Sequence, residues 1–238
     1  MKKSNAFFIL CFGLIFFSNS QAMGLRSFVA LPLDEKGKVV RVFFEHRQQA
    51  EVNKLISQAA YGISDKQTLF LGFPIELTPD GSQLFGDVSV LYRYIAWKDD
   101  QLSGTNRLGL LGGVIVPTEK HKNIAIQAGF VFTHFKNRHE IDIDALYQQG
   151  IGRDFDNGRY DLSWQYRLFP SQYPEWGITQ ELYGVLELNG RWNGRNLTHQ
   201  LTTGLQWIHQ SWVLESGVVR NLNNENEWQY ILGVRIHF

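Results

Sequence analysis

The chain has 238 residues, of which 44% are hydrophobic and 14% aromatic, and its formal net charge is zero. This length is ordinary for a single all-β barrel, and the balanced charge provides no basic face of the kind that nucleic-acid binding needs. We therefore expect one folded domain and no nucleic-acid partner.

The N-terminus carries the pattern of a secretory signal peptide. A basic start (Met1 to Lys3) precedes the apolar residues 6–17, which are too few to cross a bilayer comfortably. A polar stretch then ends in the small residue Ala22, so we expect a signal peptide over residues 1–22, cleaved after Ala22. A buried helix or a retained anchor is the alternative reading.

Removal of residues 1–22 also removes Cys11, the only cysteine, so the mature chain cannot rely on disulfides. Residues 23–37 show no regular pattern, and we expect them to form an N-terminal periplasmic segment before a barrel of residues 38–238.

From residue 38 onward, apolar and polar residues alternate with a period of two, which indicates strands with two unlike faces. In Glu140 to Gln149, for example, isoleucine alternates with aspartate. Residues that favour turns separate each segment from the next. The composition of residues 45–61 would also suit an amphipathic helix, but we expect a loop and then a strand from about Asn53 to Gly62. We count about 12 strands joined as an antiparallel, up-and-down meander.

The apolar face of these segments is suited to lipid. The segments are roughly 10 to 13 residues long, which is the length a tilted strand needs to cross a bilayer. Aromatic residues stand towards their ends, where membrane barrels carry girdles: Tyr147, Trp164, Trp192, Trp207 and Trp228. We expect a transmembrane β-barrel in the bacterial outer membrane with lipid as its surroundings; a soluble periplasmic barrel or sandwich is the alternative.

The chain ends with a strand of alternating apolar residues that stops at Phe238. This ending resembles the sorting signal of bacterial outer-membrane barrels, which implies recognition of Phe238 by the barrel-assembly machinery.

Four stretches resemble a family of outer-membrane transporters labelled as the MetA-pathway phenol-degradation family: Ala59 to Leu77, Gly86 to Tyr94, Leu108 to Thr118 and Glu227 to Phe238. Members often continue the Pro-Thr pair with Gly-Asp, whereas Glu119 follows here. The resemblance implies uptake of aromatic or other small solutes, and it implies no catalytic or binding residue.

The polar face of the strands carries charges in mid-strand, and these are our candidates for residues that line the lumen: Asp142, Asp144, Asp161, Arg167, Glu181, Glu187, Arg191 and Arg235. The Asp142 and Asp144 pair could attract cations or help to bind a divalent ion. The plainer reading is that these carboxylates pair with Arg159, Arg167 or Arg191 on neighbouring strands. Short loops give no sign of a folded-in plug.

We therefore expect a passive channel for small solutes, with a filled structural barrel without transport as an alternative. A second alternative is a lipid-modifying enzyme, because His209 and Ser211 share the face of Trp207 in a His-x-Ser spacing, where His could act as base for Ser. These two residues lie at a turn on the periplasmic side, the wrong side for such enzymes, so we expect no enzymatic activity. We also expect no metal site and no cofactor.

Overall fold

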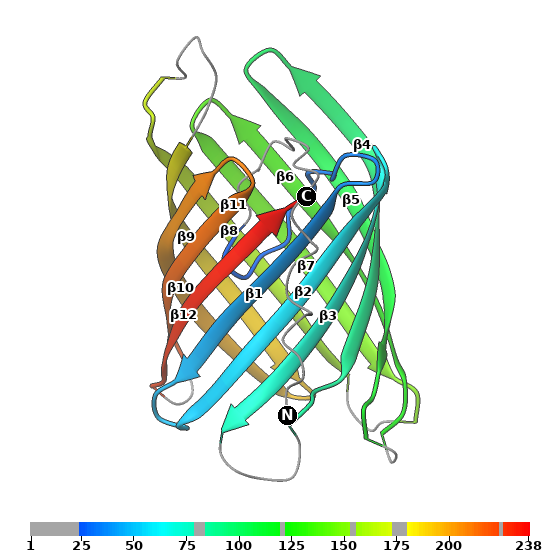
Figure 1. The fold of residues 1–238 in the computed structure, drawn as a ribbon. Helices are drawn as coiled ribbons and strands as arrows, with labels where there is room; N and C mark the ends of the chain where they lie inside the picture. The colour runs from blue at the N-terminus through cyan, green and yellow to red at the C-terminus, as the bar shows by residue number, and fades with distance from the viewer. Residues whose placement is uncertain (1–23, 79–83, 120–121, 153–155, 173–179, 224–225) are drawn as a thin grey trace, which may run out of the picture.

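The structure, a computed structural model, describes residues 24–78, 84–119, 122–152, 156–172, 180–223 and 226–238. The expected signal peptide, residues 1–22, lies outside the described residues. The described chain forms a barrel of antiparallel strands (Figure 1). The strands are β1 (Lys38–Arg47), β2 (Val52–Ser64), β3 (Gln67–Thr78), β4 (Val88–Gln101), β5 (Gly104–Val116), β6 (Ala125–Lys136), β7 (His139–Gly150), β8 (Asn157–Phe169), β9 (Gln180–Asn193), β10 (Asn196–His209), β11 (Trp212–Asn221) and β12 (Trp228–His237).

Each strand pairs with its neighbours in sequence, and β1 pairs with β12 to close the barrel. The start of β1 meets the C-terminus in this seam, where the backbone amides of Lys38 and Phe238 donate to each other's carbonyl oxygens at 3.1 and 2.8 Å. Closure leaves no unpaired strand edge, which is the condition for a sheet in hydrocarbon. The expected meander of about 12 strands is confirmed, and β2 confirms a strand in the second half of residues 45–61.

In the part of the chain that the structure describes, no helix is long and apolar enough to cross a membrane.

The two faces of the barrel wall have inverted burial. Leu232 of β12 is 64% exposed, whereas Arg235 on the same strand is 0% exposed. The same contrast recurs around the barrel: Leu110, Ile126, Leu186 and Leu205 point out, while Asp142, Ser163 and Glu187 are fully buried. A soluble protein would bury the first set and expose the second, so this wall is built to face lipid.

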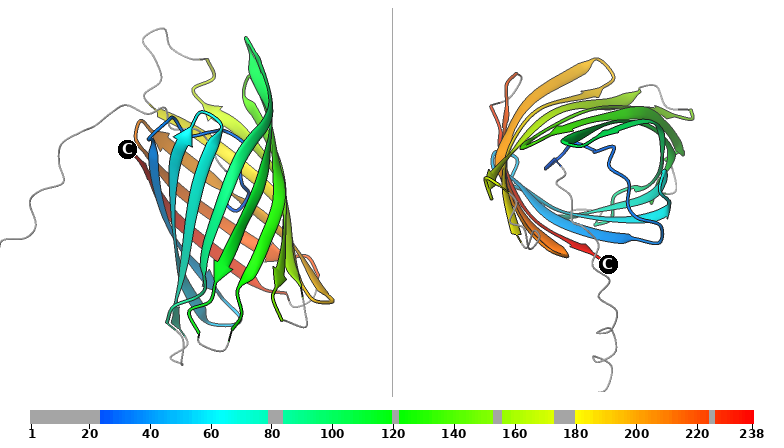
Figure 2. Two further views of the ribbon diagram at one scale, coloured as in Figure 1. Left: turned by 90° about the vertical axis from the view of Figure 1, so that its right-hand side faces the viewer. Right: turned by 90° about the horizontal axis from the view of Figure 1, so that it is seen from above.

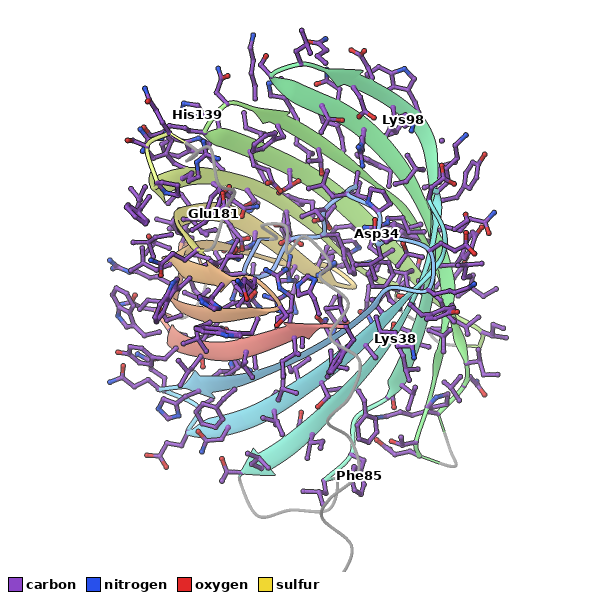
Figure 3. All side chains as sticks on the ribbon, turned by 45° about the horizontal axis from the view of Figure 1, so that its top comes forward. Asp34, Lys38, Phe85, Lys98, His139 and Glu181 are labelled. Carbon is purple, nitrogen blue, oxygen red and sulfur yellow. The ribbon has the colours of Figure 1, made fainter. Side chains whose placement is uncertain are left out.

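The two ends of the barrel differ. At the end where the C-terminus lies, two-residue turns join β2 to β3, β4 to β5, β6 to β7 and β10 to β11 (Figure 1). Apart from the turn between β9 and β10, the connections at the opposite end, near Phe85 in Figure 3, are longer. Outer-membrane barrels place short turns in the periplasm, so we expect the C-terminal end to be the periplasmic one, although the connection between β8 and β9 at this end is longer.

Residues 24–33, called the N-terminal segment below, run inside the barrel (Figure 2, right). Leu25, Val29 and Ala30 are at most 2% exposed. The segment joins β1 through a turn at residues 34–37, which is tied to β2 by a hydrogen bond of 2.8 Å from the Lys36 amide to the Gly62 carbonyl. The sequence predicted a periplasmic segment over residues 23–37 and, from the short loops, no folded-in plug. The structure instead places residues 24–33 inside the barrel, and they come from before the first strand rather than from a loop between strands.

Candidate functional site: the barrel interior and its N-terminal segment

Strand alternation turns all eight candidate residues into the interior, and seven of them are buried. The eighth, Arg191, keeps 26% of its side chain exposed. Their strands, β7, β8, β9 and β12, form one continuous part of the wall together with β10 and β11. The charged candidates thus gather on one side of the interior.

Asp142 and Asp144, neighbours on the inner face of β7, have different partners. Asp144 lies 3.6 Å from Arg159 Nη2, in agreement with the plainer reading of the sequence, and accepts a 2.7 Å hydrogen bond from the Phe28 amide. Asp142 accepts hydrogen bonds from the Thr133 hydroxyl at 2.5 Å and from the Gln165 side-chain amide at 2.8 Å. The contacts of the pair in the described structure are thus made to neighbouring groups of the protein.

Other candidate residues form ion pairs across neighbouring strands. Asp161 on β8 lies 2.7 Å from Arg191 Nη1 on β9, and Arg167 Nη1 lies 3.4 Å from Glu181 Oε1. Among the described residues there is no group of three or more His, Cys, Asp or Glu that could hold a metal ion.

Glu187 is the main acceptor for the N-terminal segment. Its carboxylate accepts hydrogen bonds from the amides of Arg26 at 3.1 Å and Ser27 at 3.4 Å, and from the Ser27 hydroxyl at 3.1 Å. Farther along the segment, the Ala30 amide donates to the Thr133 hydroxyl at 2.7 Å. Side chains of the wall thus take the place of a strand partner for the amides of the segment.

Two arginines bind the carbonyl groups of the same segment. Arg41 of β1 donates to the Leu25 carbonyl at 2.7 Å, and its Nε donates to the Glu215 carboxylate at 2.7 Å, which holds the guanidinium in place. Arg93 of β4 donates to the carbonyls of Val29 and Leu31, the latter at 2.8 Å. The segment is therefore held by carboxylates along its amides and by guanidinium groups along its carbonyls.

Apolar contacts add to these hydrogen bonds. Ala30 belongs to a buried cluster on the inner faces of β4 to β7, with Phe28 and Phe70 packed against it. The other buried members are Leu91, Ile95, Leu111, Val131 and Leu146. This apolar side lies across the interior from β11 and β12, so the segment contacts two unlike halves of the wall.

Leu25 occupies a socket made by two glycines. Gly204 and Gly217 face each other across β10 and β11. A Cβ atom added at Gly217 would lie 2.7 Å from Leu25 Cδ1, and one added at Gly204 would lie 2.6 Å from it. The absence of side chains at these two positions is what admits Leu25 to the wall.

Arg235 has few partners among the described residues of the interior. Its side chain is fully buried, and its three guanidinium nitrogens make no hydrogen bond. Its one recorded ion pair, with Glu215, spans 3.5 Å. Ser163 Oγ and Gln165 Oε1 are likewise buried without a hydrogen-bond partner.

Sequence reasoning missed the segment and the residues that hold it, namely Arg41, Arg93, Thr133 and Glu215. Their inward direction follows from the same alternation that selected the eight candidates. The segment had its own signal, since Phe28 to Leu33 reads FVALPL, an apolar run that does not suit an exposed periplasmic stretch.

His209 and Ser211, the candidates for catalysis, lie on the periplasmic rim of the exterior. The His209 ring stacks on Trp212 with centroids 5.0 Å apart, and its Nδ1 has no hydrogen-bond partner in the described structure. Ser211 sits in the two-residue turn between β10 and β11. The geometry shows an aromatic cluster at the rim, in which Trp207 and His209 both contact Trp212.

The closed ladder, the apolar exterior and the charged interior together define an outer-membrane β-barrel. Solved structures agree with this class. The chain matches KdgM porin with a TM-score of 0.58 at 9% identity, over 84% of this chain and 99% of that chain. NanC porin matches with a TM-score of 0.57 at 13% identity, over 83% of this chain and 98% of that chain.

A further structure, KdgM porin in complex with disordered oligogalacturonate, matches with a TM-score of 0.57 at 10% identity, over 84% of this chain and 99% of that chain. At such identities the likeness concerns the fold alone. No protein family matches the chain in a scan against family profiles, so the resemblance to the phenol-degradation family gains no support there. No curated protein sequence matches it either.

Proposed function

We propose that the protein is a passive channel for small polar or amphipathic solutes across the outer membrane. The observation that carries this proposal is Arg235, a buried guanidinium whose three nitrogens lack hydrogen bonds. Buried donors without partners cost free energy, and water or a polar solute removes that cost. Ser163 and Gln165 on β8 likewise hold buried polar atoms that would gain hydrogen bonds if water or a polar solute entered the interior.

The charges of the wall suggest which solutes would pass. Acidic and basic side chains alternate over the inner face, as in the Asp161–Arg191 and Arg167–Glu181 pairs. A wall of mixed sign favours neither anions nor cations, so we expect weak ion selectivity and passage of neutral or zwitterionic solutes. One fold neighbour is KdgM porin in complex with disordered oligogalacturonate, which makes oligogalacturonate a solute worth testing. The sequence resemblance adds aromatic compounds to the range.

A liposome-swelling assay with purified, folded protein tests the proposal. We expect swelling with small sugars, amino acids and simple aromatic acids, at rates that fall as solute mass rises. Planar-bilayer recordings under a salt gradient should give a reversal potential near zero. Protein-free liposomes and heat-denatured protein are the controls.

Folded protein that gives neither swelling nor channel events, including after the N-terminal segment is removed, would favour a structural barrel without transport. A separate assay tests the alternative of a lipid-modifying enzyme. If the protein were such an enzyme, the purified protein would hydrolyse lipid and Ser211→Ala would abolish that activity.

A further inference from the structure

We infer that the N-terminal segment is a displaceable plug, which keeps the barrel closed while it is seated and opens it when it leaves. This inference rests on the proposed channel function and names the element that regulates it.

The seated segment leaves the middle of the wall without access to solvent. Asp144 on β7, Glu187 on β9 and Thr133 on β6 contact the segment directly, and each is 0% exposed. Residues one strand or one position away, such as Ser163 and Thr202, are also 0% exposed. An open aqueous passage along this wall would expose them, so the seated segment covers this side of the interior at mid-height, while Ile56 and Gln58 on the inner face of β2 stay half-buried.

The segment can leave without disturbing the barrel. Its backbone groups bond to side chains of the wall, whereas the strand ladder closes on itself through β1 and β12. The turn at residues 34–37 stays hydrogen-bonded to Gly62, so the backbone would bend just before Asp34. Figure 3 labels Asp34 and, at the start of β1, Lys38. When the segment leaves, it therefore breaks contacts with side chains of the wall, and the hydrogen bonds between strands stay intact.

The hydrogen bonds that hold the segment are offset by the free-energy cost of burying ionisable groups. Glu187, Asp144 and Arg93 are all buried ionisable groups, and burial removes them from water. When the segment leaves, water can reach these groups, and their hydration offsets the lost hydrogen bonds. A small difference between the two states is what a reversible plug needs.

The socket for Leu25 shows that the seat is specific. Gly217 tolerates Leu25 because it has no side chain, and a methyl group there would lie 2.7 Å from Leu25 Cδ1. Gly112 provides a matched control, because a Cβ added there meets nothing within 4 Å.

The first test compares channel activity in planar bilayers for variants of this seat. We expect a several-fold higher conductance or open probability when residues 24–31 are replaced by a Gly-Ser stretch of equal length. Gly217→Ala should also raise the activity, whereas Gly112→Ala should leave it unchanged. In the double variant Leu25→Ala with Gly217→Ala, the activity should return towards that of the wild type, because the smaller side chain at position 25 again fits.

The second test locks the plug. The Ala30 amide lies 2.7 Å from Thr133 Oγ1, and the chain after residue 22 contains no cysteine, so Ala30→Cys with Thr133→Cys introduces a single possible disulfide. Under oxidising conditions we expect the cross-link and activity below that of the wild type; dithiothreitol should restore it. Each single cysteine variant cannot form the cross-link, so comparing it under oxidising and reducing conditions controls for the effect of the reagents alone.

The outcomes separate the plug from the channel. Equal activity of the wild-type, cross-linked and Gly-Ser variants would overturn the plug and leave the channel intact. Absence of activity in every folded variant, with folding checked by heat-modifiable gel mobility, would overturn the channel itself and the plug with it.

Discussion

Thr133 shows how one side chain can join the wall to the segment inside it. Its hydroxyl accepts a hydrogen bond from the Ala30 amide at 2.7 Å and donates to Asp142 at 2.5 Å. Gln165 completes the environment of that carboxylate at 2.8 Å. One hydroxyl therefore satisfies a buried donor and a buried acceptor together.

Replacement of this hydroxyl should be costly. Thr133→Val keeps the shape but leaves the Ala30 amide and one oxygen of Asp142 without this partner, so we expect the free energy of unfolding to fall by about 1–3 kcal/mol. Thr133→Ser, which keeps the hydroxyl, is the control. Urea unfolding in lipid vesicles, followed by tryptophan fluorescence, measures the difference; equal stability of the valine and serine variants would contradict this account.

At the scale of the element, β12 combines two separate tasks. Its backbone completes the seam with β1, and its outward side chains face lipid up to Phe238, which is 55% exposed. The fold itself therefore makes little use of the Phe238 ring. This leaves the ring available for recognition by the assembly machinery, which remains a proposal.

We expect Phe238→Ala to separate folding from delivery. The purified variant should fold into lipid vesicles about as well as the wild type, because its backbone can still pair with Lys38. Its amount in the outer membrane of cells should drop several-fold. Ile236→Ala, which alters another outward apolar side chain of β12, is the matched control, and equal loss for both variants would argue against recognition of the terminal ring.

Strands and segment differed in how far they could be predicted. Most strands follow from alternation, because each must show one face to lipid and the other to the interior. The exception is β2, whose composition is ambiguous and whose residues are half-buried on both faces over most of its length. The inward direction of Glu187 or Arg235 follows from the same rule. The partners of these residues do not follow from alternation. Glu187, for example, contacts Ser27, which lies 160 residues away in the sequence, and no local pattern marks this contact.

The whole molecule has a direction across the membrane. The C-terminus and most of the two-residue turns share one end, and the longer connections, with the exception of residues 170–179 between β8 and β9, lie at the other. This asymmetry is that of barrels whose short turns face the periplasm.

Surface labelling of intact cells checks this orientation. Lys66 lies in the exposed turn between β2 and β3 at the C-terminal end, and Arg195 lies in the exposed turn between β9 and β10 at the other. A bulky maleimide that cannot cross the outer membrane should label Arg195→Cys on intact cells and Lys66→Cys only after the membrane is opened. The reverse pattern would mean that the barrel is inserted the other way round.

The path of the N-terminal segment also has a consequence for biogenesis. Arg26 donates to Gln200 and lies near Glu45, and Leu25 needs glycines from β10 and β11, so its neighbours come from strands spread over the whole chain. That environment does not exist until the last strands have joined the sheet. Residues 24–33, which precede every strand in the chain, are therefore among the last residues to reach their native surroundings. Any factor that binds the unfolded chain must leave this segment free until β12 has closed the barrel on β1.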